Sequence, residues 1–270
     1  MDEKKIHIWP AKILRKIKRA KNIFEFVFEC DFPVTEFSPG QFINIAPLSK
    51  NSAMPRPFSI YKINSHENSV SILFKVVGEN TELLSQKRRR DKIKVWGPLG
   101  AKSDFDLIGY DECWLIGGGM GLGPLAFFEA NFWQQRKLWE GKKIRFFYGG
   151  KIIKEMVKLE LHQGTVRIAT EDGSDSYHGL VTDCFLQDLA EHSDKDILVI
   201  TCGPKPMMKQ VAEICAERKI DCHVILETIM ACGIGVCLGC SVKMNSGEME
   251  CICCKGPVFP AKEVIWDALK

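Results

Sequence analysis

The sequence predicts a β plus α/β fold: an antiparallel β-barrel domain, a parallel-sheet domain and a small cysteine-rich module at the C-terminal end. Three observations predict it. Segments of alternating apolar and polar residues fill the first hundred positions, strand and helix patterns alternate from about residue 105, and six of the twelve cysteines fall within residues 230–259. We therefore expect domains over residues 1–102, 103–225 and 226–270.

The first domain contains four segments in which apolar and polar residues alternate at a period of two, which is typical of half-buried strands. Turn signals such as Pro39-Gly40 separate these segments, so we expect short antiparallel strands in a sandwich or barrel. The predicted strands cover residues 22–30, 41–47, 69–77 and 92–100. The charged run over residues 86–92 is expected to form a solvated surface loop.

In the second domain, apolar strand segments alternate with helical segments, a pattern that favours a parallel, doubly wound sheet. The predicted strands cover residues 113–119, 143–150, 165–172 and 197–204, and the predicted helices cover residues 124–141, 155–164 and 206–220.

Composition limits the classes of function. Hydrophobic residues make up 46% and charged residues 26% of the 270 positions, which is typical of a soluble globular protein. The formal net charge of +3 gives no reason to expect a nucleic-acid partner, and no apolar run is long enough to span a membrane. The N-terminal stretch has no apolar core of a secretory signal, so we expect a cytoplasmic location, where reduced thiols favour a metal centre over disulfides.

A glycine-rich turn over residues 117–125 follows a predicted strand and precedes a predicted helix. At such a turn, helix N-terminal amides can hold a dinucleotide phosphate. The spacing does not match G-x-G-x-x-G, so a tight structural turn is the alternative. Two more strand ends, residues 170–174 and 201–208, carry glycine and small polar residues, and ligands bind at this edge of parallel sheets. The candidate nucleotide-binding residues are Gly118, Gly119, Gly121, Gly123, Pro124, Asp172, Cys202, Gly203, Pro204 and Met207.

The segment Met54 to Ile60 reads MPRPFSI and points to a second cofactor site in the barrel. The guanidinium of Arg56, among prolines, can bind a phosphate with two parallel hydrogen bonds. The hydroxyl of Ser59 could face the edge of a heteroaromatic ring. Singly, these residues fit a solvated arginine and an ordinary strand serine; together, before a nucleotide-type sheet, they favour a cofactor.

The order R-P-x-S at residues 56–59, G-x-x-T at residues 78–81 and GGGxGxGP at residues 117–124 resembles the ferredoxin–NADP reductase superfamily. The resemblance implies that FAD lies on the barrel and a nicotinamide nucleotide on the second domain. It implies that Arg56 meets the FAD phosphates and that Ser59 lies near the flavin ring. The FAD residues implied in this way are Arg56, Pro57, Phe58, Ser59, Leu73, Phe74, Lys75, Asn80 and Thr81. Asn80 stands where the superfamily usually has glycine.

The cysteine module begins with Cys232, Cys237 and Cys240, whose C-x4-C-x2-C spacing is that of plant-type [2Fe–2S] ligands. Cys253 supplies a distant fourth thiol, and the spacing alone leaves Cys251 and Cys254 as competitors. Zinc bound by four cysteines is the main alternative, because such sites also use C-x2-C pairs.

MACGIGVCLGC followed by C-x-x-G-P-V-F resembles the iron–sulfur electron-transfer subunits of two-subunit, NAD-dependent (type B) dihydroorotate dehydrogenases. The resemblance implies Cys253 as the fourth ligand. It also implies a partner, the FMN-containing catalytic subunit, in a heterotetramer with two copies of each chain. Cys251, Cys254 and Lys255 depart from the family pattern.

On this interpretation, electrons from dihydroorotate, in pyrimidine biosynthesis, pass through the [2Fe–2S] cluster and FAD to NAD⁺, because a flavin connects one-electron and two-electron chemistry. The chain itself then needs no acid–base residue for dihydroorotate. Two alternatives stay open: the same reductase scaffold serving a ferredoxin, a hydrogenase or another dehydrogenase, and a non-enzymatic zinc module. The sequence does not choose between NADH and NADPH; the family suggests NADH.

Overall fold

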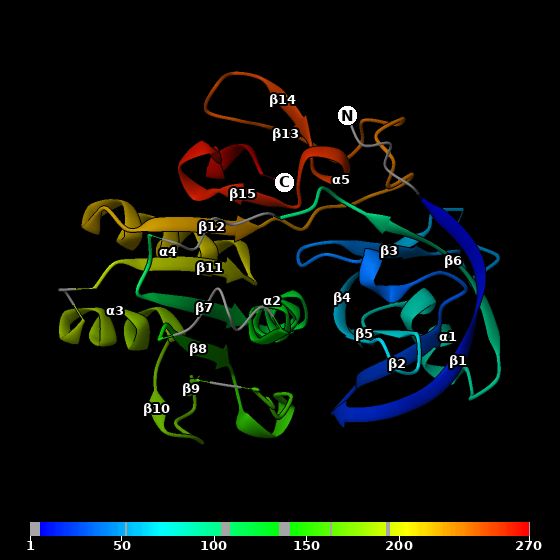
Figure 1. Ribbon diagram of the computed structural model, residues 1–270, viewed down its shortest axis with the longest axis horizontal. Helices are drawn as coiled ribbons and strands as arrows, with labels where there is room; N and C mark the ends of the chain where they lie inside the picture. The colour runs from blue at the N-terminus through cyan, green and yellow to red at the C-terminus, as the bar shows by residue number, and fades with distance from the viewer. Residues whose placement is uncertain are drawn as a thin grey trace.

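The computed structural model describes residues 6–51, 53–103, 109–134, 141–162, 164–192 and 195–269. Figure 1 shows a barrel beside an α/β sheet, with the C-terminal module lying across one end of both. Within the described ranges, no helix combines the length and apolar character that crossing a bilayer requires.

The barrel closes in the strand order β1-β2-β5-β4-β3-β6, and every neighbouring pair is antiparallel, which confirms the predicted class. Its strands are β1 (His7–Ala20), β2 (Ile23–Glu29), β3 (Phe42–Ile45), β4 (Arg56–Asn64), β5 (Ser69–Lys75) and β6 (Lys92–Leu99). The short helices η1 (Val34–Glu36) and α1 (Glu79–Gln86) lie between strands. Neither β1 nor α1 is among the predicted elements. The alternating pattern points apolar side chains such as Phe26, Phe28 and Ile72 into the barrel core.

The second domain is a seven-stranded sheet in the order β10-β9-β8-β7-β11-β12-β15. All its pairs are parallel except β12 with β15. The strands are β7 (Glu112–Gly118), β8 (Lys143–Gly150), β9 (Thr165–Thr170), β10 (Tyr177–His178), β11 (Ile197–Cys202), β12 (Asp221–Ile225) and β15 (Val258–Pro260). The helices are η2 (Gly119–Gly121), α2 (Leu122–Gln134), η3 (Ile153–Glu155), α3 (Val181–Glu191) and α4 (Lys205–Arg218). The predicted α/β alternation is therefore confirmed.

Helix α2 joins the two domains. Nine of its thirteen residues are buried, as expected for a helix that is covered on several sides. Phe128 packs in the sheet core with Leu115 and Leu198, whereas Phe127 packs in the barrel core with Phe74. Helices α3 and α4 cover the opposite face of the sheet, where Phe185 and Val211 share a cluster with strand residues. This packing fixes the barrel against the sheet.

The C-terminal module returns to the sheet. After β12 the chain forms a loop, the hairpin β13 (Ser241–Lys243) and β14 (Met249–Cys251), and helix α5 (Ile252–Lys255), and then β15 pairs with β12. The short helices η4 (Ala261–Glu263) and η5 (Trp266–Ala268) follow. A single apolar cluster contains Cys240 and Cys253 from the module, Val224 from β12 and Phe42 from the barrel. The module therefore packs on both domains.

The predicted helix over residues 155–164 is wrong. Only the short η3 forms, and irregular chain follows it. The backbone N–H of Val157 donates to the hydroxyl of Tyr148 at 3.5 Å, and that of His162 donates to Glu129 at 2.9 Å. Side chains of other elements thus replace helical partners, and tertiary packing overrides a weak local propensity. The predicted end of the helix over residues 124–141 falls partly on residues 135–140, outside the described residues.

Candidate functional site

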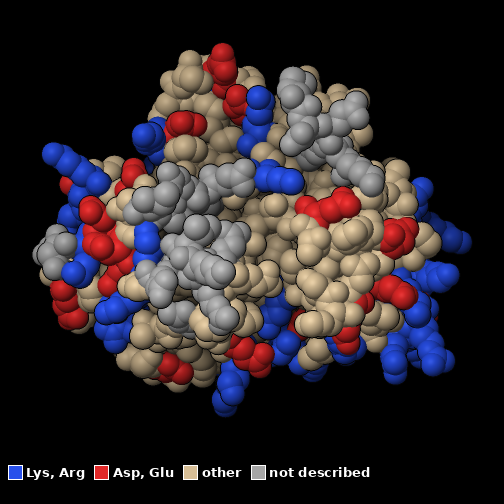
Figure 2. All heavy atoms as spheres, in the orientation of Figure 1, with Lys and Arg blue, Asp and Glu red and all other residues tan. Residues whose placement is uncertain are grey.

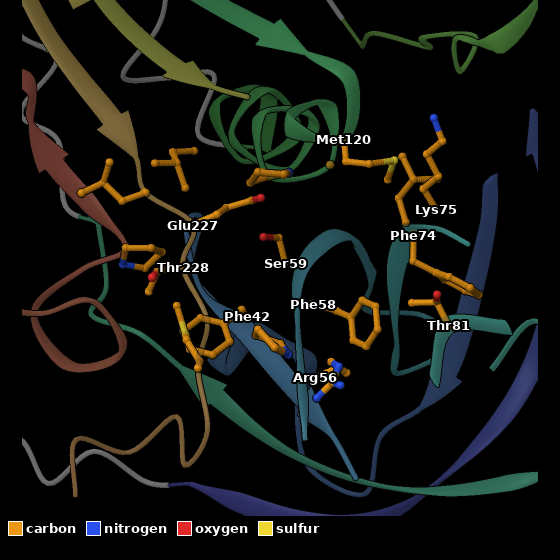
Figure 3. Close-up of a pocket in the computed structure, with 18 of the residues that line it drawn as sticks. Phe42, Arg56, Phe58, Ser59, Phe74, Lys75, Thr81, Met120, Glu227 and Thr228 are labelled. Carbon is orange, nitrogen blue, oxygen red and sulfur yellow. The ribbon is translucent and has the colours of Figure 1, made fainter. Parts of the chain in front are cut away.

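A first cleft of about 310 Å³ lies between the barrel and the sheet (Figure 3). Eight of the nine residues that the superfamily resemblance implies for FAD line it: Arg56, Pro57, Phe58, Ser59, Leu73, Phe74, Lys75 and Thr81. They come together because β4 pairs with β5, and because the chain after β5 turns into α1. Their convergence in one hollow supports a cofactor interpretation of the R-P-x-S segment.

Arg56 and Thr81 are locally ordered. The Arg56 Nη1 atom donates to the carbonyl oxygens of Met54 at 2.9 Å and Pro55 at 3.2 Å. The hydroxyl oxygen of Thr81 accepts the backbone N–H groups of Val77 at 3.0 Å and Gly78 at 3.1 Å. The Thr81 hydroxyl in turn donates to the carbonyl oxygen of Gly78 at 2.8 Å, which fixes the turn into α1. The Arg56 guanidinium is thus held at the cleft wall, where a phosphate group would find a charged donor.

Asn80 does not line the cleft. Its side-chain oxygen accepts the backbone N–H groups of Leu48 at 3.0 Å and Ser49 at 3.3 Å, so it ties the loop after β3 to α1. The residue that departs from the superfamily pattern thus has a positioning role in this structure.

A second cleft of about 470 Å³ lies at the carboxyl ends of the parallel strands. Of the predicted nucleotide residues, Gly118, Gly119, Pro204 and Met207 line it. Gly123 and Pro124 line the first cleft instead. Residues that the sequence reasoning did not find make up most of the remaining wall: Ile23, Tyr148, Gly149, Gly150, Lys151, Ile152, Glu155, Met156, Glu171, Gly179, Leu180, Val181, Thr182, Pro206 and Gln210.

The other four predicted nucleotide residues do not line either cleft. The carboxylate of Asp172 accepts hydrogen bonds from the hydroxyl and backbone N–H of Ser174, which lower the pKa of Asp172. Burial raises the pKa of the Cys202 thiol well above its ordinary value, and this thiol lies 3.7 Å from the carbonyl of Ile225. Gly121 and Gly203 pack at the same strand ends, where a Cβ at either position would meet backbone atoms.

Lys75 and Met120 line both clefts, so the two clefts adjoin at these side chains. Figure 3 shows both side chains on the wall of the first cleft. Two ligands bound in the clefts would approach one another there. This is the arrangement that hydride transfer between a flavin and a nicotinamide requires.

The far wall of the first cleft comes from the segment after β12, which includes Glu227, Thr228 and Met230. Figure 3 shows the Glu227 carboxyl group pointing toward Ser59. Glu227 is open to the cleft yet enclosed by protein on its other sides, and this desolvation raises the pKa of its carboxyl group. The sequence reasoning missed this segment, although it lies at the same sheet edge as the other predicted strand ends.

The cysteine loop presents backbone N–H groups to sulfur. The Cys232 sulfur accepts N–H groups from Ile234 at 3.4 Å and Cys237 at 3.5 Å. Each of the other three predicted ligand sulfurs also accepts one backbone N–H: Cys237 from Gly239, Cys240 from Cys253, and Cys253 from Gly235. Positive φ angles of 74° at Gly233 and 84° at Gly235 turn the loop so that it can do this.

The same pattern separates the competing thiols. Cys251 contacts the hydroxyl of Ser241 at 3.2 Å, and Cys254 contacts the Cys253 sulfur at 3.8 Å. Among the described residues, neither of these two sulfurs accepts a backbone N–H. Because N–H bonds stabilise thiolate ligands, this favours Cys253 as the fourth ligand.

The sulfurs differ in their readiness to ionise. Burial would raise the pKa of Cys232, but hydrogen bonds from Ile234 and Cys237 outweigh it and lower the pKa to about 7. Burial and the neighbouring Cys240 raise the pKa of Cys253, so a thiolate there needs a bound cation. Among the described residues no three acidic, histidine or cysteine side chains converge closely enough to hold a metal ion. The donor set, three sulfurs of the loop and the Cys253 sulfur of α5, each accepting a backbone N–H, nevertheless fits an iron–sulfur cluster.

The outer edge of the cysteine loop is apolar and exposed. Cys237 is exposed, and around it Ile234, Val236 and Leu238 are 45%, 78% and 64% exposed. Cys240 and Cys253 lie on the inner side and are buried. A cluster held by this loop would be near the protein surface on one side and near the first cleft on the other.

Comparisons with known proteins agree with this three-part organisation. Family models match for an oxidoreductase FAD-binding domain at residues 10–103, an oxidoreductase NAD-binding domain at residues 115–213, and the iron–sulfur cluster binding domain of dihydroorotate dehydrogenase B at residues 227–265. The chain thus carries domains for FAD, NAD and an iron–sulfur cluster.

Two curated relatives are "Dihydroorotate dehydrogenase B (NAD(+)), electron transfer subunit" of Clostridium acetobutylicum and of Caldanaerobacter subterraneus. The first is 31% identical, over 94% of this chain and 96% of the relative; the second is 33% identical, over 95% and 98%. A solved chain of the NADH-dependent reduced ferredoxin-NADP oxidoreductase is 29% identical, with a TM-score of 0.85 over 97% of this chain and 91% of that chain. The extent of identity to the curated relatives establishes that this chain belongs to the family of dihydroorotate dehydrogenase B electron-transfer subunits.

Proposed function

We propose that this chain carries electrons from a separate catalytic subunit, which oxidises dihydroorotate in pyrimidine biosynthesis, to NAD⁺. One observation supports the proposal most directly: the first cleft borders both of the other sites. It meets the second cleft at Lys75 and Met120, and it meets the cysteine module at Phe42 and Met230. Three redox sites in this order form a path between one-electron and two-electron chemistry.

FAD in the first cleft would exchange a hydride with nicotinamide on one side and single electrons with the cluster on the other. The protein's part is to bind and orient. In this proposal Arg56 and Thr81 face the FAD phosphates, Ser59 and Glu227 lie near the flavin ring, and Gly118 and Gly119 admit the nicotinamide nucleotide. Cys232, Cys237, Cys240 and Cys253 are the proposed cluster ligands.

The partner would dock at the outer edge of the cysteine loop. Exposed Ile234, Val236 and Leu238 surround Cys237, and apolar side chains of this kind form the centres of protein interfaces. We propose that the partner is the FMN-containing catalytic subunit, in a cytoplasmic heterotetramer with two copies of each chain. Electrons would then enter at the cluster and leave as NADH.

The similarity to the NADH-dependent reduced ferredoxin-NADP oxidoreductase supports a second candidate, a reductase that exchanges electrons with ferredoxin. Isolation of the complex from its natural host decides between them. Our proposal predicts FAD, a [2Fe–2S] absorption and EPR spectrum, NADH-dependent reduction of artificial acceptors, and an accompanying FMN protein that oxidises dihydroorotate. A partner without that activity, together with ferredoxin reduction, supports the second candidate. Recovery of zinc and no flavin would reject both.

A further inference from the structure

The carbonyl oxygen of Cys232 accepts two hydrogen bonds from the barrel. The Asn44 side-chain nitrogen donates to it at 3.3 Å, and the Trp96 indole N–H donates to it at 3.4 Å. These donors come from neighbouring strands, since Asn44 of β3 pairs with Trp96 of β6. They join residues that are 188 and 136 positions apart in the chain, so the barrel holds the first cysteine of the loop directly.

Strand β3 is shared by the first cleft and the cysteine module. Its Ile43 and Ile45 point into the barrel core, which leaves Phe42 and Asn44 on the outer face. Phe42 lines the first cleft and also packs in the apolar cluster that contains Cys240 and Cys253. Two residues further along the same face, Asn44 contacts Cys232. A single short strand therefore touches both the proposed flavin site and the proposed cluster ligands.

The contact between Asn44 and the loop is close. A Cβ atom at Gly233 would stand 2.5 Å from the Asn44 side-chain nitrogen and 2.9 Å from Leu99. Only glycine, at its φ of 74°, lets the Cys232–Gly233 peptide approach the barrel this far. The position of the first cysteine is thus set by direct packing as well as by hydrogen bonds.

Asn44 is fully buried, and its side-chain oxygen has no hydrogen-bond partner among the described residues. The backbone carbonyl oxygen of Cys232 can only accept a hydrogen bond, so the NH₂ group of the Asn44 side chain must face it. The side-chain oxygen of Asn44 then points away and is left without a partner among the described residues. Buried polar atoms without a partner are rare, and each one requires an explanation. An aliphatic residue would fill this position without that penalty, which indicates that the N–H donor is needed here.

We propose that Asn44 and Trp96 are positioning residues for electron transfer: together they hold the Cys232 end of the cluster loop at a fixed place beside the flavin site. This inference rests on the proposed function. The two donors act on a backbone carbonyl of the ligand loop, and they set the environment of the cluster without touching it. Groups of this kind, one step removed from a metal centre, tune both its retention and its electronic properties.

The test uses the purified full chain with its cofactors. Asn44→Asp keeps the size of the side chain and replaces the N–H donor by an acceptor; Trp96→Phe keeps an aromatic ring and removes the other donor. We expect both variants to retain FAD and to be reduced at the flavin by NADH within about twofold of wild type. We expect chelators to remove iron roughly tenfold faster, in line with the usual cost of losing such a partner, and the EPR spectrum and midpoint potential of the cluster to change.

Ser71→Ala is the matched control. Ser71 is also a buried barrel residue whose side-chain oxygen has no hydrogen-bond partner among the described residues, but it lies on β5 and pairs with β2 and β4 instead of contacting the loop. We expect its cluster to behave as in wild type. Gly233→Ala, which pushes the loop away from Asn44, should reproduce the Asn44→Asp spectrum.

Unchanged iron loss, EPR spectrum and potential in both Asn44→Asp and Trp96→Phe would overturn the inference. If Asn44→Asp fails to fold, Trp96→Phe alone decides. A wild-type protein that holds FAD and cluster but passes no electrons to a dihydroorotate-oxidising partner would overturn the proposed function, while the spectra would still support or reject the role of Asn44. Wild-type protein without iron would overturn both.

Discussion

The backbone carbonyl of Cys202 lies directly against Gly121: a Cβ atom at position 121 would stand 2.1 Å from the Cys202 oxygen. Gly121 belongs to the turn after β7, and Cys202 ends the adjacent strand β11. This contact joins two strand ends at the edge where the second cleft opens. The glycine-rich turn therefore contributes close backbone packing as well as access for a ligand.

Replacing Gly121 by alanine tests this packing. The added methyl group cannot fit without moving the backbone, so we expect unfolding free energy to fall by about 1–3 kcal/mol and the KM for NADH to rise. Thermal unfolding and steady-state kinetics measure the two effects. Gly109→Ala is the control, because no atom of the described residues lies within 4 Å of a Cβ at that position. Equal stability of the two variants would contradict the prediction.

Arg56 is expected to bind the phosphate end of FAD. Losing a hydrogen bond to a charged group costs about 1.5–3 kcal/mol, so Arg56→Ala should weaken FAD binding by roughly 10- to 100-fold. Flavin fluorescence on titration of deflavinated protein measures the Kd. Lys62→Ala, on the same strand but outside the cleft lining, should bind FAD normally, and Arg56→Lys should fall in between. Flavin occupancy independent of residue 56 would remove the phosphate assignment.

Single serine substitutions identify the fourth cluster ligand. Because the Cys253 sulfur accepts the Gly235 N–H at 3.1 Å and is buried, we expect Cys253→Ser to lose most of the iron. Cys251→Ser and Cys254→Ser should keep iron content and the [2Fe–2S] EPR signal near wild type. Iron analysis and EPR of anaerobically purified protein give the answer. If Cys254→Ser were instead the variant that loses iron, the ligand would be the neighbouring thiol.

A buried ion pair in the sheet makes stability depend on pH. Arg145 Nε donates to Glu112 at 2.8 Å, and the Trp114 indole donates to it at 2.9 Å. Burial would raise the pKa of Glu112, but these two hydrogen bonds outweigh it and lower the pKa below the ordinary 4.5. A carboxyl group whose pKa is lowered by folding stabilises the protein above its unfolded pKa, and this contribution is lost as the pH falls through the folded value.

We therefore expect Arg145→Met to cost about 3 kcal/mol of unfolding free energy at pH 7, because Glu112 stays buried without its main partner. The difference from wild type should shrink as the pH falls below the ordinary glutamate value and through the lowered pKa of Glu112, where its carboxyl group becomes protonated. Urea unfolding at several pH values measures this. Arg15→Met breaks the exposed pair with Glu67 and should cost less than about 1 kcal/mol. A pH-independent loss in Arg145→Met would show that the pair is not the cause.

Much of the fold was predictable from local patterns. The strand over residues 143–150 is predicted with the bounds of β8, and the other predicted strands and the helix over residues 206–220 match observed elements within a few residues. The prediction failed over residues 155–164, where side chains of Tyr148 and Glu129 take the backbone N–H groups. It also missed β1, whose mixed polar and charged sequence gives a weak alternation signal.

For the candidate site, too, the local motifs were predictable from the sequence and the contacts between distant segments were not. Residue identity and short spacing along the chain specify the C-x4-C-x2-C loop, the R-P-x-S segment and the glycine turn, because each is a local signal a few residues long. Contacts between distant segments depend on how the domains pack, and no local pattern encodes them. Three contacts exist only in the folded chain. The Glu227 carboxyl group points toward Ser59, and Asn44 donates to the carbonyl oxygen of Cys232, which is 188 positions away in the chain. The side chain of Asn80 accepts a backbone N–H from the loop after β3. The sequence alone predicts the order of the three domains along the chain. The position of the first cleft between the second cleft and the cysteine module depends on helix α2, which packs against barrel and sheet, and on strand β15, which pairs the module with the sheet, because these contacts join segments far apart in the sequence.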